Sequence, residues 1–155
     1  MIVSSRSFVN NGIIPLKHTG FGEDLSPELM ISDVPEATVS LAIVLDDLDV
    51  PFTKAFNHWI VWNSPKTDVS PEGLPMGQTI CAPIPACQGM AWGRNCYRGP
   101  KPPFFIRNIH RYVFRVYALD CRLDLPESSD KKRLLVAMSG HILAEAQIIG
   151  KFERK

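Results

Sequence analysis

Residues 110–120, HRYVFRVYALD, decide the fold class because β-branched and aromatic residues predominate in them. Successive side chains of a strand point to opposite faces, so residues two apart share a face. One face then carries Tyr112, Phe114, Val116 and Ala118, and the other carries Arg111, Val113, Arg115, Tyr117 and Leu119. Since both faces contain apolar residues, this stretch is predicted to be a central strand of a sheet.

Other parts of the chain have the same character. Residues 37–47, ATVSLAIVLDD, and residues 58–63, HWIVWN, are compact and apolar and are predicted to be buried strands. In residues 7–16, SFVNNGIIPL, the pair Asn11-Gly12 tolerates positive φ and predicts a tight hairpin. Thirteen prolines and ten glycines favour short elements joined by turns over long helices. The chain is therefore predicted to be mainly β.

One helix is predicted near the C-terminus. Ser128 or Ser129 can cap it, and Asp130 suits the positive start of the helix dipole. Its apolar stripe consists of Leu134, Leu135 and Met138. Gly140 is expected to end the helix. Residues 142–148 alternate as on a strand but include good helix formers, so we expect a short helical turn or irregular start that passes into a final strand.

Length and composition suit one globular domain spanning residues 1–155, with 45% hydrophobic residues. Lys and Arg number 17 against 16 for Asp and Glu, so charge gives no argument for a nucleic-acid or membrane-surface partner. The N-terminal residues lack the signal-peptide pattern, and no window approaches a membrane span. We therefore expect a cytoplasmic protein with no integral membrane association.

The four cysteines, Cys81, Cys87, Cys96 and Cys121, are expected to be reduced thiols because no secretory signal precedes them. They contain no CxxC pair, so no zinc site is predicted. No local signature supports a cysteine nucleophile, and Cys121 is interpreted as a small buried hydrophobic residue. GxSxG, GxxxxGK[ST], HExxH and GxGxxG are also absent from the sequence. We predict no catalytic residue, no metal and no cofactor.

Three aspartates, Asp46, Asp47 and Asp49, directly follow an apolar run and leave two interpretations open. In the first, they form a solvated strand end that leads into a turn at Pro51. In the second, Asp47 and Asp49 point the same way in the extended chain and form a carboxylate pair at the rim of a sheet. Such a pair would suit acid–base chemistry, metal binding or hydrogen bonding.

Two histidines, His58 and His110, each open an apolar strand and each follow a loop. A single histidine at a strand end is usually a polar terminus or a satisfied core residue. Two of them raise the expectation that both lie at the same edge of one sheet. Tyr112 would share a strand face with His110, whereas Arg111 must point the other way. With the aspartates, these side chains would form an anion or metal pocket.

Residues 15–36 and 64–108 are predicted to be mostly loop, and loops this long are commonly functional. Within the second lies the segment 99–103, GPKPP. It is either a rigid polyproline-like connector or an anion-binding loop. In the second case the backbone amides of Gly99 and Lys101 are held in a fixed direction, because proline has no N–H group.

Five segments in this order resemble the phosphatidylethanolamine-binding protein family, in particular its bacterial YbhB/YbcL-like members, also called Raf kinase inhibitor-like. They are DLSPELMISDVP (24–35), DDLDVP (46–51), HWIVWNSP (58–65), YRGPKPP (97–103) and HRYVFRVYALD (110–120). The resemblance runs from about Phe8 to Phe152. It implies a Greek-key antiparallel β-sandwich with a short C-terminal helical region. It also implies a shallow pocket at one end of the large sheet that binds phosphate or phosphorylated head groups.

Carried over by position, the resemblance implies a ligand-binding set of Asp47, Asp49, His58, Gly99, Lys101, Pro103, His110 and Tyr112. Two departures affect it. Leu48 stands where the family usually has proline, so the turn that aims Asp47 is less constrained. Residues 79–96, which contain three of the four cysteines, do not match the family's core motifs and border the pocket.

The function expected is that of a small non-enzymatic binding protein for an anionic or phosphorylated ligand. The resemblance also implies a homodimer and regulation through protein partners, including kinase inhibition in animals, but the sequence identifies no partner. Anion affinity is expected to weaken as pH rises through roughly 6 to 8, where histidine loses its charge. One alternative is a hydrolase or metal-dependent enzyme that uses Asp47, Asp49, His58 and His110. Another is a structural homo-oligomer whose pocket is vestigial.

Overall fold

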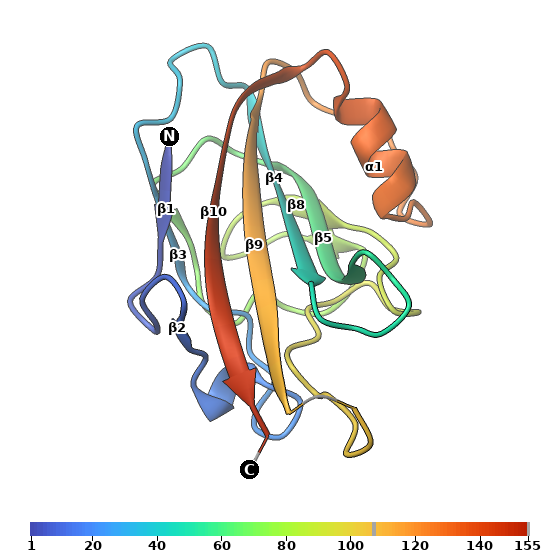
Figure 1. Ribbon diagram of the computed structural model, residues 1–155. Coiled ribbons are helices and arrows are strands. Elements are labelled where there is room, and N and C mark those ends of the chain that lie inside the picture. Colours follow the sequence, from blue (N-terminus) through green and yellow to red (C-terminus); the bar gives the residue numbers. More distant parts are fainter. Residues whose placement is uncertain (107, 155) are drawn as a thin grey trace.

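The computed structural model describes residues 1–106 and 108–154 and consists of two sheets and one α-helix in that part of the chain (Figure 1). The larger sheet contains, from edge to edge, β2 (Gly12–Ile13), β10 (Ile142–Glu153), β9 (Ile109–Leu119), β4 (Ser40–Asp47), β5 (Phe56–Ser64), β8 (Ala86–Gln88) and β7 (Thr79–Ile80). The smaller sheet contains β1 (Ile2–Ser4), β3 (Leu29–Ser32) and β6 (Val69–Ser70). The helical elements are a 3₁₀ turn, η1 (Leu16–His18), and α1 (Lys131–Met138). The prediction of a mainly β fold is confirmed.

Strand β9 lies in the middle of the large sheet and pairs antiparallel with both β10 and β4 (Figure 1). Its two faces divide as the alternation predicts. Tyr112, Phe114, Val116 and Ala118 belong to the core on one side of the sheet, and Tyr117 and Leu119 belong to the core on the other side. The chain passes from β5 through a long connection before it returns beside β4, which gives the non-sequential strand order expected of a Greek key.

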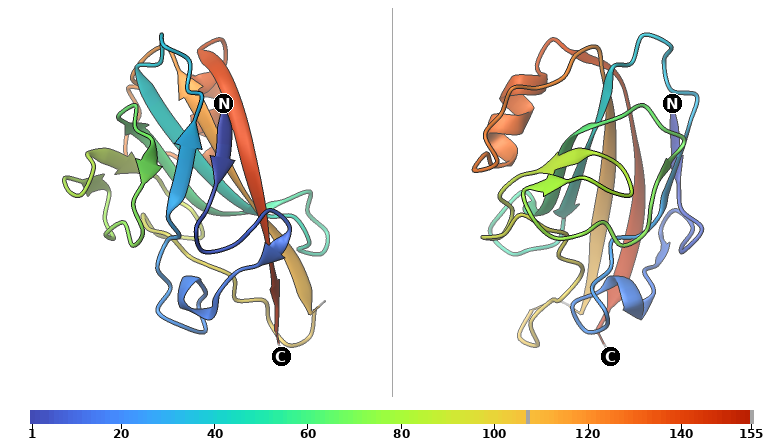
Figure 2. Two further views of the ribbon diagram at one scale, coloured as in Figure 1. Left: turned by 90° about the vertical axis from the view of Figure 1, so that its left-hand side faces the viewer. Right: turned by 180° about the vertical axis from the view of Figure 1, so that it is seen from behind.

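The large sheet is covered on both faces (Figure 2). The small sheet packs on one face, where Leu29 and Ile31 of β3 meet residues such as Ile43 of β4. Helix α1 packs on the other, where Leu134 and Met138 meet a cluster of residues from β4, β5 and β9. Because each apolar stripe needs a partner to cover it, this three-layer arrangement accounts for the apolar residues on both faces of β4 and β9.

Several details of the helix differ from the prediction. The cap is Asp130, whose carboxylate accepts a hydrogen bond from the Arg133 amide at 3.0 Å, rather than Ser128 or Ser129. An aspartate provides both the capping oxygen and the negative charge that the helix start favours. Leu135 is 40% exposed, so it does not belong to the buried stripe. Gly140, at φ +82°, lies in the turn that follows the helix, as predicted.

Two further predictions about local structure need correction. The Asn11-Gly12 turn forms, with Asn11 at φ +63° and the Gly12 amide bonded to the Val9 carbonyl at 2.8 Å, but it does not close a hairpin. Instead β2 leaves the turn and pairs in parallel with β10. The segment after Gly140 forms the expected final strand from Ile142 onward, with an irregular start at the register shift between Ile142 and Ala144, but it has no helical turn. The long open edge of β9 provides backbone partners along the whole of β10, which overrides local helix propensity.

The connections carry less structure than the strands. The stretch 64–108 contains only the short strands β6, β7 and β8 among its described residues, and 15–36 contains η1 and β3. Within the part of the chain that the structure covers, no helix has both the length and the apolar character needed to cross a membrane. The side chains predicted from the sequence to bind a ligand lie at the ends of β4, β5 and β9 or in the long loops beside them.

Candidate functional site

A cavity of about 610 Å³ opens where the end of β4 meets the starts of β5 and β9. This size is typical of a small-molecule site, for which volumes of roughly 300–1,000 Å³ are usual. Its lining consists of Asp47, Val50, Pro51, Phe52, Phe56, His58, Trp92, Lys101, Pro102, Pro103, Phe105, Ile106, His110 and Tyr112. Most of these residues are apolar, so the few polar groups would determine how a ligand is oriented.

Asp47, the last residue of β4, is 2% exposed and holds three neighbours. Its Oδ2 accepts a hydrogen bond from Nδ1 of His110 at 2.6 Å, and its Oδ1 accepts one from the Asp49 amide at 2.9 Å. The Tyr112 hydroxyl donates to the same carboxylate. Because Asp46 and Asp47 are both buried within β4, the interpretation of these residues as a solvated strand end is wrong.

His110 is fully buried, and its two ring nitrogens differ. Nδ1 is fixed by Asp47, whereas Nε2 has no hydrogen-bond partner among the residues that the structure describes. A buried polar nitrogen without a partner is costly, and it is a feature of sites where a ligand or water supplies the missing bond. His110 also lines the cavity, so a ligand there can supply that bond.

His58 and Tyr112 meet edge to face, with ring centroids 5.4 Å apart. Nδ1 of His58 donates to the Arg98 carbonyl at 2.8 Å. Burial lowers the pKa of His58 below its usual value, although the Arg98 carbonyl and the Asp47 charge act in the opposite direction. Burial, then the Asp47 charge and the hydrogen bond to it, raise the pKa of Tyr112. The two histidines therefore lie at the same edge of one sheet, as predicted.

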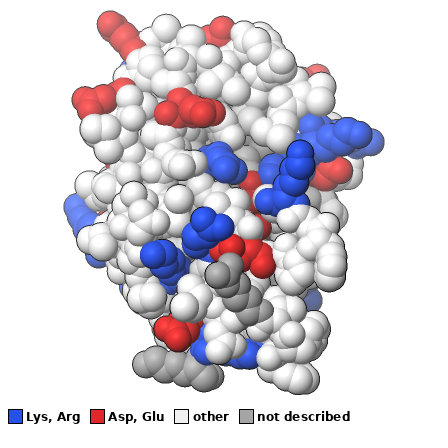
Figure 3. All heavy atoms as spheres, in the orientation of Figure 1, with Lys and Arg blue, Asp and Glu red and all other residues white. Residues whose placement is uncertain are grey.

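Six of the predicted site residues line the cavity, namely Asp47, His58, Lys101, Pro103, His110 and Tyr112. Asp49 and Gly99 do not. The Asp49 carboxylate binds the Arg111 guanidinium through both oxygens at 2.9 Å, on the outer side of the sheet. Asp47 and Asp49 therefore do not form the same-facing carboxylate pair, because the chain turns where the Asp49 amide bonds back to Asp47. On the face of the molecule seen in Figure 3, Lys and Arg side chains lie among Asp and Glu side chains.

Gly99 has a packing role in this structure. Its amide donates to Oδ1 of Asp24 at 2.7 Å, which uses the N–H group that the anion-loop interpretation requires. A Cβ at this position would lie 2.1 Å from the His18 carbonyl oxygen, so only glycine fits. The Tyr97 hydroxyl donates to that same carbonyl at 2.7 Å. The segment 97–101 is therefore anchored on η1, and Lys101 remains as its predicted residue at the cavity.

The sequence-based set missed the aromatic wall of the cavity. The Trp92 ring lies 5.1 Å from His58 and 5.5 Å from Phe56. Arg98 stacks over Trp92 at 3.9 Å and donates to its carbonyl, which fixes the ring beside the histidine. Phe52 and Phe105, at 107% and 74% exposed, stand at the rim. A tryptophan before glycine in a long predicted loop was the available signal for this wall.

The family model for phosphatidylethanolamine-binding proteins matches residues 4–153. The chain belongs to this family. Among its relatives, a UPF0098 protein of Pyrococcus horikoshii is 41% identical over 97% of this chain and 76% of the relative. A UPF0098 protein of Methanothermobacter thermautotrophicus is 39% identical over 99% of both chains.

Solved structures give the same family. A phosphatidylethanolamine-binding protein homologue of Chlamydia trachomatis superimposes with a TM-score of 0.87, at 38% identity, over 99% of this chain and 97% of that one. YbcL of E. coli, described as a new member of the mammalian PEBP family, superimposes with a TM-score of 0.86, at 27% identity, over 99% of this chain and 98% of that one. The resemblance based on five short segments is therefore confirmed.

Proposed function

We propose that this protein is a small non-enzymatic binding protein whose cavity takes the phosphate or phosphorylated head group of an amphipathic molecule. The observation that carries the proposal is Nε2 of His110, buried at the cavity without a partner while Asp47 fixes the other ring nitrogen. The Asp47 contact orients the ring. Nε2 is thereby left available to form a hydrogen bond with a phosphate group in the cavity.

The charge of Asp47 must be compensated when an anion binds. An anion beside an ionised Asp47 would be repelled by on the order of 4 kcal/mol per unit charge at contact distance, with an effective dielectric near 20. A proton taken up by the His58 imidazole on binding replaces this repulsion with attraction. Lys101 at the cavity adds a further positive charge. The anionic group is therefore expected to bind together with a proton.

The apolar lining supports the amphipathic part of the proposal. Trp92, Phe56 and the rim residues Phe52 and Phe105 offer no charge to a ligand but can cover a hydrocarbon portion. Covering apolar surface contributes about 25 cal/mol per Å² removed from water. A phosphorylated head group that carries a short acyl chain should therefore bind more tightly than the head group alone.

The test is a titration with inorganic sulfate, phosphoethanolamine and a dihexanoyl phosphatidylethanolamine kept below its micelle concentration. Binding is followed by NMR shifts of the histidine and Tyr112 signals. Tyr112→Phe should weaken binding of all three by roughly 5- to 30-fold, because Asp47 loses a hydrogen-bond donor worth about 1–2 kcal/mol. Tyr117→Phe, on the opposite face of the same strand, is the matched control and should bind as the parent does.

Either of two results would contradict the proposal. One is the absence of shifts with all three compounds, which would favour a structural homo-oligomer with a vestigial pocket. The other is equal affinity of Tyr112→Phe and the parent. A large fall in the melting temperature of Tyr112→Phe would indicate a core role instead.

The proposal extends to a homodimeric state and regulation through a protein partner, which the family resemblance suggests, and to a cytoplasmic location. Sedimentation of the purified protein tests the first. The competing hypothesis of a hydrolase or metal-dependent enzyme receives less support. Asp49 is engaged by Arg111, and Asp47, Asp49, His58 and His110 do not converge as a metal-ligand group in the described residues.

A further inference from the structure

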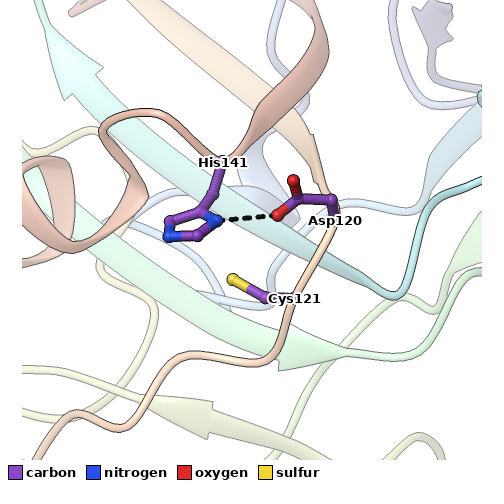
Figure 4. A group of neighbouring side chains, drawn as sticks. All are labelled: Asp120, Cys121 and His141. Atoms are coloured by element: carbon purple, nitrogen blue, oxygen red, sulfur yellow. Dashed lines mark hydrogen bonds and ion pairs between the residues drawn. The ribbon is translucent and has the colours of Figure 1, made fainter.

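A second group of reactive side chains lies at the other end of the large sheet. Asp120 and Cys121 directly follow β9, and His141 directly precedes β10 (Figure 4). The eight residue-to-residue steps from Tyr112 to Asp120 span roughly 26 Å of extended chain, so this group is remote from the cavity. The chain brings it together by pairing β9 with β10 and spanning the gap with α1.

The three side chains point toward one another in Figure 4. Nδ1 of His141 lies 2.8 Å from Oδ1 of Asp120. One ligand atom from each residue, including the Cys121 sulfur, lies within 4.8 Å of the other two. In the described part of the chain, no other three His, Cys, Asp or Glu residues meet this condition.

We propose that Asp120, Cys121 and His141 form a zinc-binding site with three protein ligands and an open fourth position. A thiolate, an imidazole and a carboxylate are the ligand types that Zn²⁺ uses in proteins. With usual zinc–ligand lengths, a tetrahedral site separates nitrogen and oxygen by about 3.3 Å, and sulfur and nitrogen by about 3.6 Å. The His141–Asp120 contact would need to open by about half an ångström, and the sulfur, which lies within 4.8 Å of the other two atoms, would need to approach them by at most about 1.2 Å.

Backbone contacts hold the three residues in place. The Asp120 amide donates to the His141 carbonyl at 3.1 Å, and the His141 amide donates to the Met138 carbonyl at 2.9 Å. The hydroxyl of Ser40, itself fully buried, donates to the Cys121 carbonyl. These bonds fix the backbones from which all three ligands project, so binding a metal would require little ordering of the chain.

In the metal-free protein, protons occupy ligand atoms that the cation would bind. Burial and the neighbouring Asp120 raise the pKa of the Cys121 thiol, so it is protonated at neutral pH. The cation would displace that proton and the Nδ1 proton of His141 that Asp120 now accepts. Roughly half of the His141 and Asp120 side chains is exposed, which gives the cation access and leaves room for water in the fourth position.

The test uses Co²⁺, which fills zinc sites and reports thiolate ligation through a charge-transfer absorption band. The reduced protein should bind one Co²⁺ per chain with this band and with the visible bands of tetrahedral cobalt, and Zn²⁺ should displace it. Cys121→Ser should abolish the charge-transfer band, and His141→Gln should weaken Zn²⁺ binding by at least about 10-fold. Cys81→Ser and Cys87→Ser are matched thiol controls and should keep both.

Circular dichroism of each variant shows whether it is folded. If Cys121→Ser fails to fold, alkylation of the Cys121 thiol in the parent protein provides the second route and should likewise abolish the band. A charge-transfer band that survives the loss of the Cys121 thiol would overturn the proposal. So would Zn²⁺ affinity unchanged in His141→Gln, or no stoichiometric binding by the parent protein.

Discussion

At the scale of single residues, the two cavity histidines differ in what holds them. His58 donates from Nδ1 to a neutral carbonyl, whereas Nδ1 of His110 bonds to a carboxylate. A carbonyl fixes the tautomer without adding a full negative charge, and burial then lowers the pKa of His58. One cavity therefore holds two imidazoles in distinct electrostatic settings.

Anion affinity should consequently increase as the pH falls. Burial lowers the pKa of His58 in the ligand-free protein below its ordinary value of 6.5. Proton uptake on binding is therefore expected at a lower pH than the range of 6 to 8 expected from the sequence. An anion bound beside the ring raises that pKa again, and the added proton is then taken up on binding. The charged groups that face His58 are Asp47, Asp46 and Arg98.

The measurement is calorimetric titration with sulfate between pH 5.5 and 8.5, because sulfate itself does not titrate there. His58→Gln should reduce the pH dependence, and His141→Gln, at the far end of the sheet, should leave it unchanged. Sulfate affinity that stays flat across this range in the parent protein would contradict the proposed role of the histidines.

At the scale of elements, α1 depends on its two buried side chains, Leu134 and Met138, more than on its amphipathic pattern. Leu134 is fully buried against the large sheet, whereas its neighbour Leu135 is 40% exposed. Lys131 at the helix start also binds the buried Asp46 of β4 at 2.6 Å, and Arg115 of β9 binds the same carboxylate at 3.2 Å. The helix is thus attached to the sheet by the apolar side chains of Leu134 and Met138 and by the ion pair of Lys131.

Leu134→Ala should lower the free energy of unfolding by about 2–5 kcal/mol, because it leaves a cavity between α1 and the sheet. Leu135→Ala makes the same chemical change on the exposed side and should cost less than about 1 kcal/mol. Urea denaturation of both variants, analysed with a common slope, provides the comparison. Equal losses in the two variants would show that the helix is not packed as described.

Elements whose structure follows from the local sequence pattern were predicted well. Elements whose structure depends on pairing with a distant segment were not. The alternation in β9 correctly predicted which side chains enter each core, because strand geometry fixes it locally. The turn at Asn11-Gly12 was predicted, but its strand pairs in parallel with β10, which no local signal encodes. Likewise, Gly99 was predicted to bind the ligand. The structure instead requires glycine there because a Cβ would collide with the carbonyl of His18, 81 positions earlier in the chain.

The same limit applies to the candidate site. His58, His110 and Tyr112 could be expected to converge because each lies at a predictable strand start. Trp92 could not be placed, since its position depends on stacking with Arg98 in a long irregular loop. The group of Asp120, Cys121 and His141 has no sequence spacing typical of metal sites, because the pairing of β9 with β10 assembles it.

At the scale of the whole molecule, two buried histidines hold the segment 97–101 that connects η1 to the cavity. His58 in β5 binds the Arg98 carbonyl, and the carbonyl of His18 in η1 receives the Tyr97 hydroxyl. The His18 ring donates to the Leu25 carbonyl at 2.8 Å and accepts from the Ser7 hydroxyl at 2.9 Å, so it is satisfied as neutral imidazole. Protonation of either ring would place a positive charge beside the segment 97–101.

Stability should therefore fall as the pH decreases below about 6.5. Burial lowers the pKa of both His18 and His58, so below 6.5 the unfolded chain takes up protons more readily than the folded protein. The stabilisation is fully present above the unfolded pKa of 6.5 and is lost toward the lower folded pKa. Each histidine contributes a slope of at most about 1.4 kcal/mol per pH unit.

Urea denaturation in phosphate-free buffer between pH 5.2 and 7.5 measures this dependence of the unfolding free energy on pH. His18→Gln should remove the part of the dependence that comes from His18. An unfolding free energy that rises as the pH falls would contradict the neutral state of these rings, and with it the link between η1, segment 97–101 and the cavity.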